Sequence, residues 1–338
     1  MIPSDRAREQ IGIAAGDGLG ASTLLLDSVL EPILRLSRMR EDGFRLATRN
    51  AERVITADVF SVDPIIFPGG NIGSLAAAGV CNDLLASGAG INEIALGVYA
   101  SAHLETEVLR ECLRSFNAFI EPLGAQVVCG DTKVHPSPKP ELLLFATALG
   151  TALSERRFDL ADTQVGDDII ITGALGDHAI AVLSAREGLG FESVVASDAR
   201  PLHDPIAKLV SQNVVHSLRD LTRGGLTAAL WDGYRATKLG WTVYEDSLPV
   251  HRPVRAAAEM LGLDVLTLTN EGCMLITCRP EHRETVMAIL HSCPSTAEAA
   301  VVGTVREELG GIGPVLMGPF GAARALVFPH GISVPRLC

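Results

Sequence analysis

The sequence predicts an α/β (α+β) protein of two domains, and three observations support this. Strand-like apolar runs alternate with segments of helical periodicity along the chain. A polar stretch, SERRFDLADTQVG (154–166), interrupts the alternation, which then starts again. With 338 residues, the chain is long enough for two hydrophobic cores. We therefore expect an N-terminal domain at 11–155, a C-terminal domain at 156–330 and a terminal tail at 331–338.

The first half is expected to form strands and two helices. The segment NIGSLAAAGVCNDLLASGAG (71–90) is typical of a helix of small residues, and apolar residues at helical spacing predict a second helix across 108–120. The expected strands are RVITADVFSV (53–62), INEIALGVYAS (91–101), AQVVCGDTKV (125–134) and ELLLFATALG (141–150).

The second half repeats the alternation. DDIIITGAL (167–175) predicts a strand, and VLTLTNEGCMLITC (265–278) predicts a β-hairpin whose turn holds Asn270, Glu271 and Gly272. The expected helices are HAIAVLSAREGL (178–189), PIAKLVSQNV (205–214) and GGLTAALWDGYRATKLG (224–240). His178 is expected to have a structural role.

Composition excludes several classes of function. The net charge of −12, without a dense Lys/Arg run, argues against a protein that binds nucleic acid. No apolar stretch is long enough to span a membrane, and MIPSDRAREQ is not a signal peptide, so we expect a cytoplasmic protein.

The seven cysteines form no CxxC pair, which argues against a disulfide framework. Cys129, Cys273 and Cys278 lie in apolar strand-like runs and are expected in the core. Cys338 is the last residue, and a terminal thiol suits neither a core nor a disulfide.

Several aspartates beside small or turn residues are candidate ligands of a metal ion. Asp58 interrupts an otherwise apolar strand, and Asp131 follows Gly130 and precedes Lys133. A carboxylate in an apolar context needs a partner, and Mg²⁺ commonly joins carboxylates to nucleotide phosphates. Helix caps and ordinary ion pairs remain the alternative. The full candidate set is Asp42, Asp58, Asp83, Asp131 and Asp220.

Two glycine-rich stretches are candidates for phosphate binding. AAGDGLGAS (14–22), with Gly16 and Gly18, opens a helical run whose free N–H groups suit phosphate, but it is neither a Walker loop nor a Rossmann fingerprint. LRDLTRGGLTAAL (218–230) places Asp220, Arg223 and Gly224 just before a helix, where an acid and a cation suit phosphate or metal. An N-terminal cap with a solvated arginine is the alternative reading of the second stretch.

Together these segments resemble the PurM-like (AIR synthetase) superfamily of ATP-dependent enzymes and, within it, the HypE family of hydrogenase maturation factors. The resemblance covers nearly the whole chain. The closing PRLC is its most specific part, because members of this family end in a near-identical Pro-Arg-aliphatic-Cys tail that related kinases and synthetases lack. The other matching segments are FPGGNIGSLAAAGVCNDLLASGA, GDTKV, GDHAIAVLSAREGLGFES, LRDLTRGGL and NEG.

The resemblance implies an ATP-dependent carbamoyl dehydratase. Cys338, on a mobile tail, would accept a carbamoyl group from a HypF-like carbamoyltransferase. ATP would phosphorylate the thiocarboxamide oxygen, and loss of phosphate would leave S-cyanocysteine, a thiocyanate. The cyano group would then pass to the HypC–HypD complex for the iron of nickel–iron hydrogenase. The family also implies a homodimer, with the N-terminal strands and the helix at 74–90 buried at the two-fold interface.

The resemblance also assigns roles to residues of this chain. The catalytic residues would be Cys338, the general base Glu271 and Lys133, which would hold phosphate or polarise the thiocarboxamide oxygen. The residues that would bind ATP are Gly16, Gly18, Asn82, Asp131, Arg223 and Gly224. Those that would bind Mg²⁺ are Asp42, Asp58, Asp83, Asp131 and Asp220.

The chain departs from the family pattern at three places. Ala15 stands where the N-terminal glycine loop of the family has histidine, Leu221 replaces the proline of an RDPTRGG motif, and the run HPSPKPELLLF after GDTKV diverges. Two other functions therefore stay open: a PurM-like kinase or synthetase acting on a free small molecule, and a non-catalytic maturation scaffold.

Overall fold

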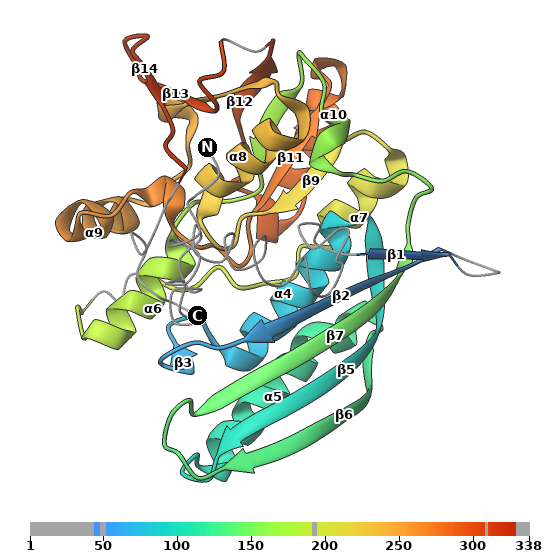
Figure 1. Ribbon diagram of the computed structural model, residues 1–338, viewed down its shortest axis with the longest axis vertical. Coiled ribbons are helices and arrows are strands. Elements are labelled where there is room, and N and C mark those ends of the chain that lie inside the picture. The colour runs from blue at the N-terminus through green and yellow to red at the C-terminus, as the bar shows by residue number, and fades with distance from the viewer. Residues whose placement is uncertain (1–43, 48–51, 191–194, 308–309, 329–338) are drawn as a thin grey trace, which may run out of the picture.

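The structure is a computed structural model that describes residues 44–47, 52–190, 195–307 and 310–328. Over these residues the chain forms two large sheets, each with helices packed against it (Figure 1). The predicted two-domain α/β fold is thereby confirmed. The change from the first sheet to the second falls between Ala152 and Asp168, while the exact domain limit at 155/156 stays a prediction.

The first sheet has the strand order β1-β2-β7-β5-β6, and only β5 and β6 pair in parallel. Helices α4 (Ile72–Ala86) and α5 (Thr106–Ile120) pack together beside it. Its strands are β1 (Phe44–Ala47), β2 (Glu52–Phe60), β5 (Ala89–Ser101), β6 (Gln126–His135) and β7 (Leu142–Ala152). A small ribbon of β3 (Ile66–Phe67) and β4 (Gly70–Asn71) leads into α4.

The second sheet has the order β14-β13-β10-β12-β8-β11-β9. Its strands are β8 (Asp168–Ile171), β9 (Ser217–Asp220), β10 (Gly240–Tyr244), β11 (Met274–Cys278), β12 (Ala300–Arg306), β13 (Val315–Met317) and β14 (Ala323–Ala325). Its helices are α6 (Asp177–Glu187), α7 (His203–Gln212), α8 (Gly225–Thr237), α9 (Arg252–Leu261) and α10 (Arg283–His291). No helix in the described part of the chain is long and apolar enough to cross a membrane.

The predicted hairpin at 265–278 is wrong. Its first arm is a 3₁₀ turn at Val265–Thr267, which the Asp264 side chain caps by accepting a hydrogen bond from the Leu266 N–H. The second arm, β11, pairs with β8 and β9 instead. A short apolar run cannot reveal whether its partner is its neighbour in sequence.

The prediction for the cysteines is partly wrong. Cys273 and Cys278 are buried as expected, but Cys129 is exposed. Cys129 lies on β6, which is the outermost strand of its sheet and is exposed along nearly its whole length. An apolar run therefore marks an edge strand here rather than a core strand.

Helix α4 forms the centre of the molecule. Its start is fixed by Asn71, whose side chain accepts the N–H groups of Gly73 and Ser74, while the Ser74 hydroxyl accepts the Asn71 N–H. Every residue of α4 except Asp83 is buried. The helix packs against β2, β5 and β7 on one side and touches β9 and α7 on the other.

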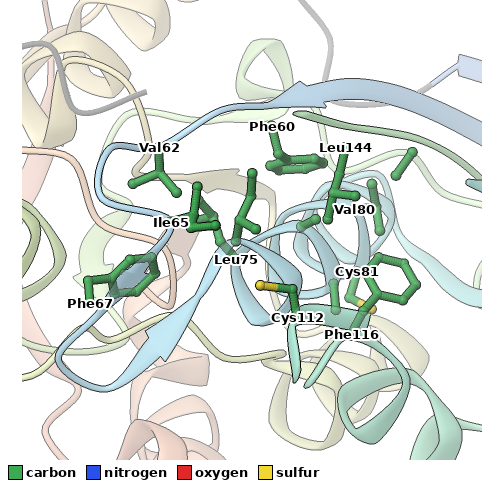
Figure 2. Close-up of a cluster of buried hydrophobic side chains, with 14 of the residues drawn as sticks. Phe60, Val62, Ile65, Phe67, Leu75, Val80, Cys81, Cys112, Phe116 and Leu144 are labelled. Atoms are coloured by element: carbon green, nitrogen blue, oxygen red, sulfur yellow. The ribbon is translucent and has the colours of Figure 1, made fainter. Parts of the chain in front are cut away.

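Small residues in α4 allow this close packing. A Cβ atom on Gly73 would lie 1.7 Å from the carbonyl oxygen of Cys112 in α5, and one on Gly79 would lie 2.6 Å from the Phe60 ring. Figure 2 shows the apolar cluster around the helix, including Phe60 and Cys112. Since α4 is covered by its own chain, the expectation that the helix at 74–90 forms a two-fold interface is wrong.

We predict that Gly73→Ala destabilises the protein by about 1–3 kcal/mol, because the methyl group meets backbone of α5 that cannot move without separating the two helices. Denaturant unfolding measures the change. Gly90→Ala is the matched control, because a Cβ at this strand position finds its nearest neighbour at 3.6 Å. Equal stability of the two variants would contradict the role we assign to Gly73.

Candidate active site

Two of the predicted metal ligands lie where β2 meets α4. Thr56 and Phe60 are buried, and alternation along β2 places Asp58 on the same face, where Asp58 itself stays exposed. The Thr56 hydroxyl donates a 2.8 Å hydrogen bond to the Asp83 carboxylate on α4. Desolvation raises the pKa of Asp58 and neighbouring Asp220 adds to the rise, while the Val59 N–H and the Arg223 guanidinium oppose it.

The turn between β9 and α8 brings Asp220 and Arg223 to this place. Asp220 ends β9, opposite Met274 of β11. Gly224 and Gly225 both have positive φ, at 79° and 56°, and a Cβ on Gly225 would lie 2.5 Å from the Leu268 carbonyl oxygen. Only glycine suits this turn, because a side chain would be strained in the backbone and would also clash.

Leu221, which departs from the family motif, has a structural explanation. Its side chain is fully buried, and its N–H donates a 3.0 Å hydrogen bond to the Cys273 carbonyl oxygen. Proline lacks this donor. The leucine therefore adds one backbone link between the β9–α8 turn and the segment that leads into β11.

The loop before β11 presents Glu271. The buried Asn270 side chain supports this loop, because it accepts the Gly176 N–H at 2.7 Å and donates to the carbonyl oxygens of Leu221 and Leu268. Glu271 itself is only 7% exposed. Its N–H and that of Gly272 each donate a 3.0 Å hydrogen bond to the carboxylate of Asp198.

The pKa of Glu271 is raised well above its ordinary value. Burial is the largest cause; the negative charges of Asp198, Asp220 and Asp58 add to it, and Arg223 opposes it. The structure thus brings together four predicted site residues from three separate segments: Asp58, Asp220, Arg223 and Glu271.

The donor chemistry of this cluster fits a hard cation. Its carboxylates raise one another's proton affinity, and a divalent ion would relieve that repulsion. No group of three or more His, Cys, Asp or Glu side chains among the described residues is arranged as a ready metal site. An ion bound by these carboxylates would need further oxygen ligands, such as phosphate oxygens.

Asp131 and Lys133 lie away from this cluster. They pair with Gly97 and Tyr99 of β5, on the face opposite Leu96, which joins the core beside α4. They are exposed on the edge strand β6. Within one chain the structure does not bring them together with Glu271. The other predicted residues Gly16, Gly18, Asp42 and Cys338 lie outside the described residues.

The comparisons with known proteins agree with this architecture. Residues 41–152 and 164–313 match the N-terminal and C-terminal domains of the AIR synthase related proteins. The chain is 33% identical to the carbamoyl dehydratase HypE of Azotobacter vinelandii, over the whole length of both chains. The chain belongs to the HypE family. The resemblance predicted from the sequence is therefore confirmed.

Solved structures from the HypE family have the same fold. A crystal structure of HypE in complex with ATP has a TM-score of 0.81 and 31% identity, and covers 96% of this chain and 99% of its own. A HypE–HypF complex has a TM-score of 0.84 and 29% identity, and covers 90% of this chain and 99% of its own.

Sequence reasoning missed Asp198, although the HypE-family motif NEG that it supports was recognised. Asp198 is buried in the irregular segment between α6 and α7, where a single acid has no periodic pattern. The same segment holds Ser197, whose hydroxyl lies 2.8 Å from Nδ1 of His178. Burial lowers the pKa of His178 to about 3, so this histidine is neutral near pH 7, and its structural role stays a prediction.

We predict that Glu271→Gln stabilises the protein by about 1–2 kcal/mol at pH values where wild-type Glu271 is ionised, because the glutamine removes a buried charge from among other acids. Since the folded-state pKa of Glu271 is raised, its ionisation opposes folding, so the gain should disappear as pH falls and wild-type Glu271 is protonated. Thermal melts at about pH 8 and about pH 5 measure this. A gain that is the same at both pH values would contradict the assigned environment.

Proposed function

We propose that this chain is an ATP-dependent carbamoyl dehydratase that acts on its own Cys338 and forms S-cyanocysteine for hydrogenase maturation. The observation that carries the proposal is the buried Glu271, whose raised pKa suits a general base that must first take up and then release protons. Membership of the HypE family supports it, because the full-length relative is a carbamoyl dehydratase and a solved relative binds ATP.

The chemistry explains why ATP is needed. An amide oxygen is a poor leaving group, so the γ-phosphoryl group first moves to the thiocarboxamide oxygen, and one N–H proton leaves. In the second step the C–O bond breaks, phosphate departs with the second N–H proton, and the nitrogen lone pair completes the C≡N bond. ADP, phosphate and the cyano group are the products. Glu271 would accept the nitrogen proton in at least one of these steps.

The acids around Glu271 would hold Mg²⁺. Asp58, Asp83 and Asp220 are the described candidates, with Asp42 proposed from the family pattern. When bound, the ion would neutralise phosphate charge during the transfer. Arg223 and Gly224 lie at the start of α8 and would receive phosphate oxygens.

We propose further that the chain is a homodimer joined through the open face of its first sheet. Val59 and Phe145 are cross-strand partners on this face and are 56% and 43% exposed. Across the next two strands, Phe145 of β7 lies beside Gly97 of β5, and Gly97 lies beside Asp131 of β6. A two-fold contact here would bury this apolar surface, and it would let Asp131 and Lys133 serve a site shared with the second protomer.

The proposed partners follow from the reaction. A HypF-like carbamoyltransferase would load Cys338, in keeping with the solved HypE–HypF complex, and the HypC–HypD complex would accept the cyano group.

Intact-mass spectrometry with HypF, carbamoyl phosphate and ATP tests the reaction. Wild type should gain one carbamoyl group and then lose one water. Cys338→Ala should gain nothing, and Glu271→Gln should keep the carbamoyl group without losing water. Cys293→Ala and Glu259→Gln are the controls, because Cys293 is a partly exposed cysteine, Glu259 is an exposed glutamate, and we assign neither a role.

The outcomes separate the other functions. A scaffold would neither gain the carbamoyl group nor consume ATP, and a kinase of free small molecules would hydrolyse ATP without needing Cys338. An adduct that maps to another cysteine would refute the proposed reaction.

Light scattering tests the dimer. We expect Phe145→Asp to give monomers at micromolar concentration, because a charge would be buried at the centre of the proposed contact. Val165→Asp is the control, since Val165 is 51% exposed and lies outside both sheets. A wild-type protein that is monomeric at this concentration would exclude the proposed contact.

A further inference from the structure

The peptide groups on both sides of Glu271 are held by side chains from both domains. On the C-terminal-domain side, Asp198 accepts the N–H groups of Glu271 and Gly272, each at 3.0 Å. On the N-terminal-domain side, Asn82 of α4 donates from Nδ2 to the Glu271 carbonyl oxygen at 3.2 Å. The N–H groups of Glu271 and Gly272 and the carbonyl oxygen of Glu271 are therefore all fixed by hydrogen bonds.

Asn82 is fully engaged by protein. Its Nδ2 also donates to the Arg200 carbonyl oxygen at 3.1 Å, and its Oδ1 accepts the Leu202 N–H at 2.9 Å. It is 4% exposed. Its carboxamide thus joins α4 to the 195–202 segment and to Glu271, which favours a supporting role over the direct contact with nucleotide predicted from the sequence.

Asp198 is held equally firmly. It is 5% exposed, and the preceding residue, Ser197, donates its N–H to the Pro68 carbonyl oxygen at 2.8 Å. The fit leaves no room for a side chain at Gly272, where a Cβ would lie 1.9 Å from the Asp198 carbonyl oxygen. The contact between the two loops is therefore a close backbone approach that glycine makes possible.

We propose that Asp198 and Asn82 are positioning residues for Glu271, which fix its backbone from opposite domains and so determine where its carboxylate meets the substrate. The proposal rests on the proposed function of Glu271 as the general base. Neither residue needs to touch the substrate to affect the rate, because a small displacement of a catalytic group is sufficient.

Asp198 also changes the proton affinity of the base. Glu271 faces the charges of Asp198, Asp220, Asp58 and Arg223, and among these Asp198 contributes most to its raised pKa. Asp198 faces Arg200 and Asp177 as well, and burial raises its own pKa to about 6. Removing the Asp198 charge should therefore lower the pKa of Glu271.

The test compares Asp198→Asn with Ser197→Ala by intact-mass spectrometry of the carbamoylated protein across pH. Asparagine keeps one acceptor but sets an amide donor against the second N–H. We expect Asp198→Asn to accept the carbamoyl group normally, to lose water about 100-fold more slowly near neutral pH, and to shift the acid limb of its rate profile to lower pH. Ser197→Ala changes the same segment but removes no hydrogen bond to Glu271, so it should leave the acid limb of the pH–rate profile unchanged.

A second measurement does not depend on activity. Hydrogen exchange at the Glu271 and Gly272 amides should be slow in wild type and about tenfold faster in Asp198→Asn. Asn82→Asp keeps the acceptor for Leu202 and loses both donors, so it should slow water loss while leaving those two amides protected. It also carries the test if Asp198→Asn fails to fold.

The outcomes separate the two proposals. If wild type loses no water, the proposed function fails, and amide exchange still decides whether Asp198 holds the loop. If wild type is active and Asp198→Asn keeps its rate and pH profile, the positioning role is refuted. Equal effects of Asp198→Asn and Ser197→Ala on the acid limb would also refute it.

Discussion

The burial of α4 on all sides is the constraint on which the rest of the structure depends. One side of the helix completes the core of the first sheet, and the other touches β9 and α7 of the second domain. Gly73 and Gly79 allow the close packing within the first domain, because larger side chains would collide with α5 and Phe60. Asn82 and Asp83 lie near the end of the same helix, so its packing decides where the two domains meet at the candidate site.

The candidate site concentrates negative charge at that junction. Glu271 is buried among acids that disfavour its ionised form, and the N–H groups of Glu271 and Gly272 are held by the Asp198 carboxylate. Such an arrangement opposes stability. Natural proteins keep local conflicts of this kind mainly where function requires them.

The spacing of apolar residues along the sequence predicted many of the helices and strands. The small-residue helix and four of the five strands of the first sheet were predicted, while β1 was missed. The structure brings Asp58, Asp220, Arg223 and Glu271 near one another, and their role as a site stays a prediction. The failures concern partners distant in the chain. The pattern could not show that 265–278 pairs with other strands, that Cys129 lies on an edge strand, or that Asp198 supports Glu271 from a separate loop.

The two neighbours Asn82 and Asp83 impose a limit on how α4 can change in length. Asn82 reaches the loops of the second domain, while Asp83 meets Thr56 on β2. About three helical turns separate Asn82 from the capping residue Asn71, so both lie on nearly the same side of the helix. Inserting or deleting one residue would rotate everything beyond it by about 100° around the axis. Insertions and deletions within this helix should therefore be far less tolerated than conservative substitutions.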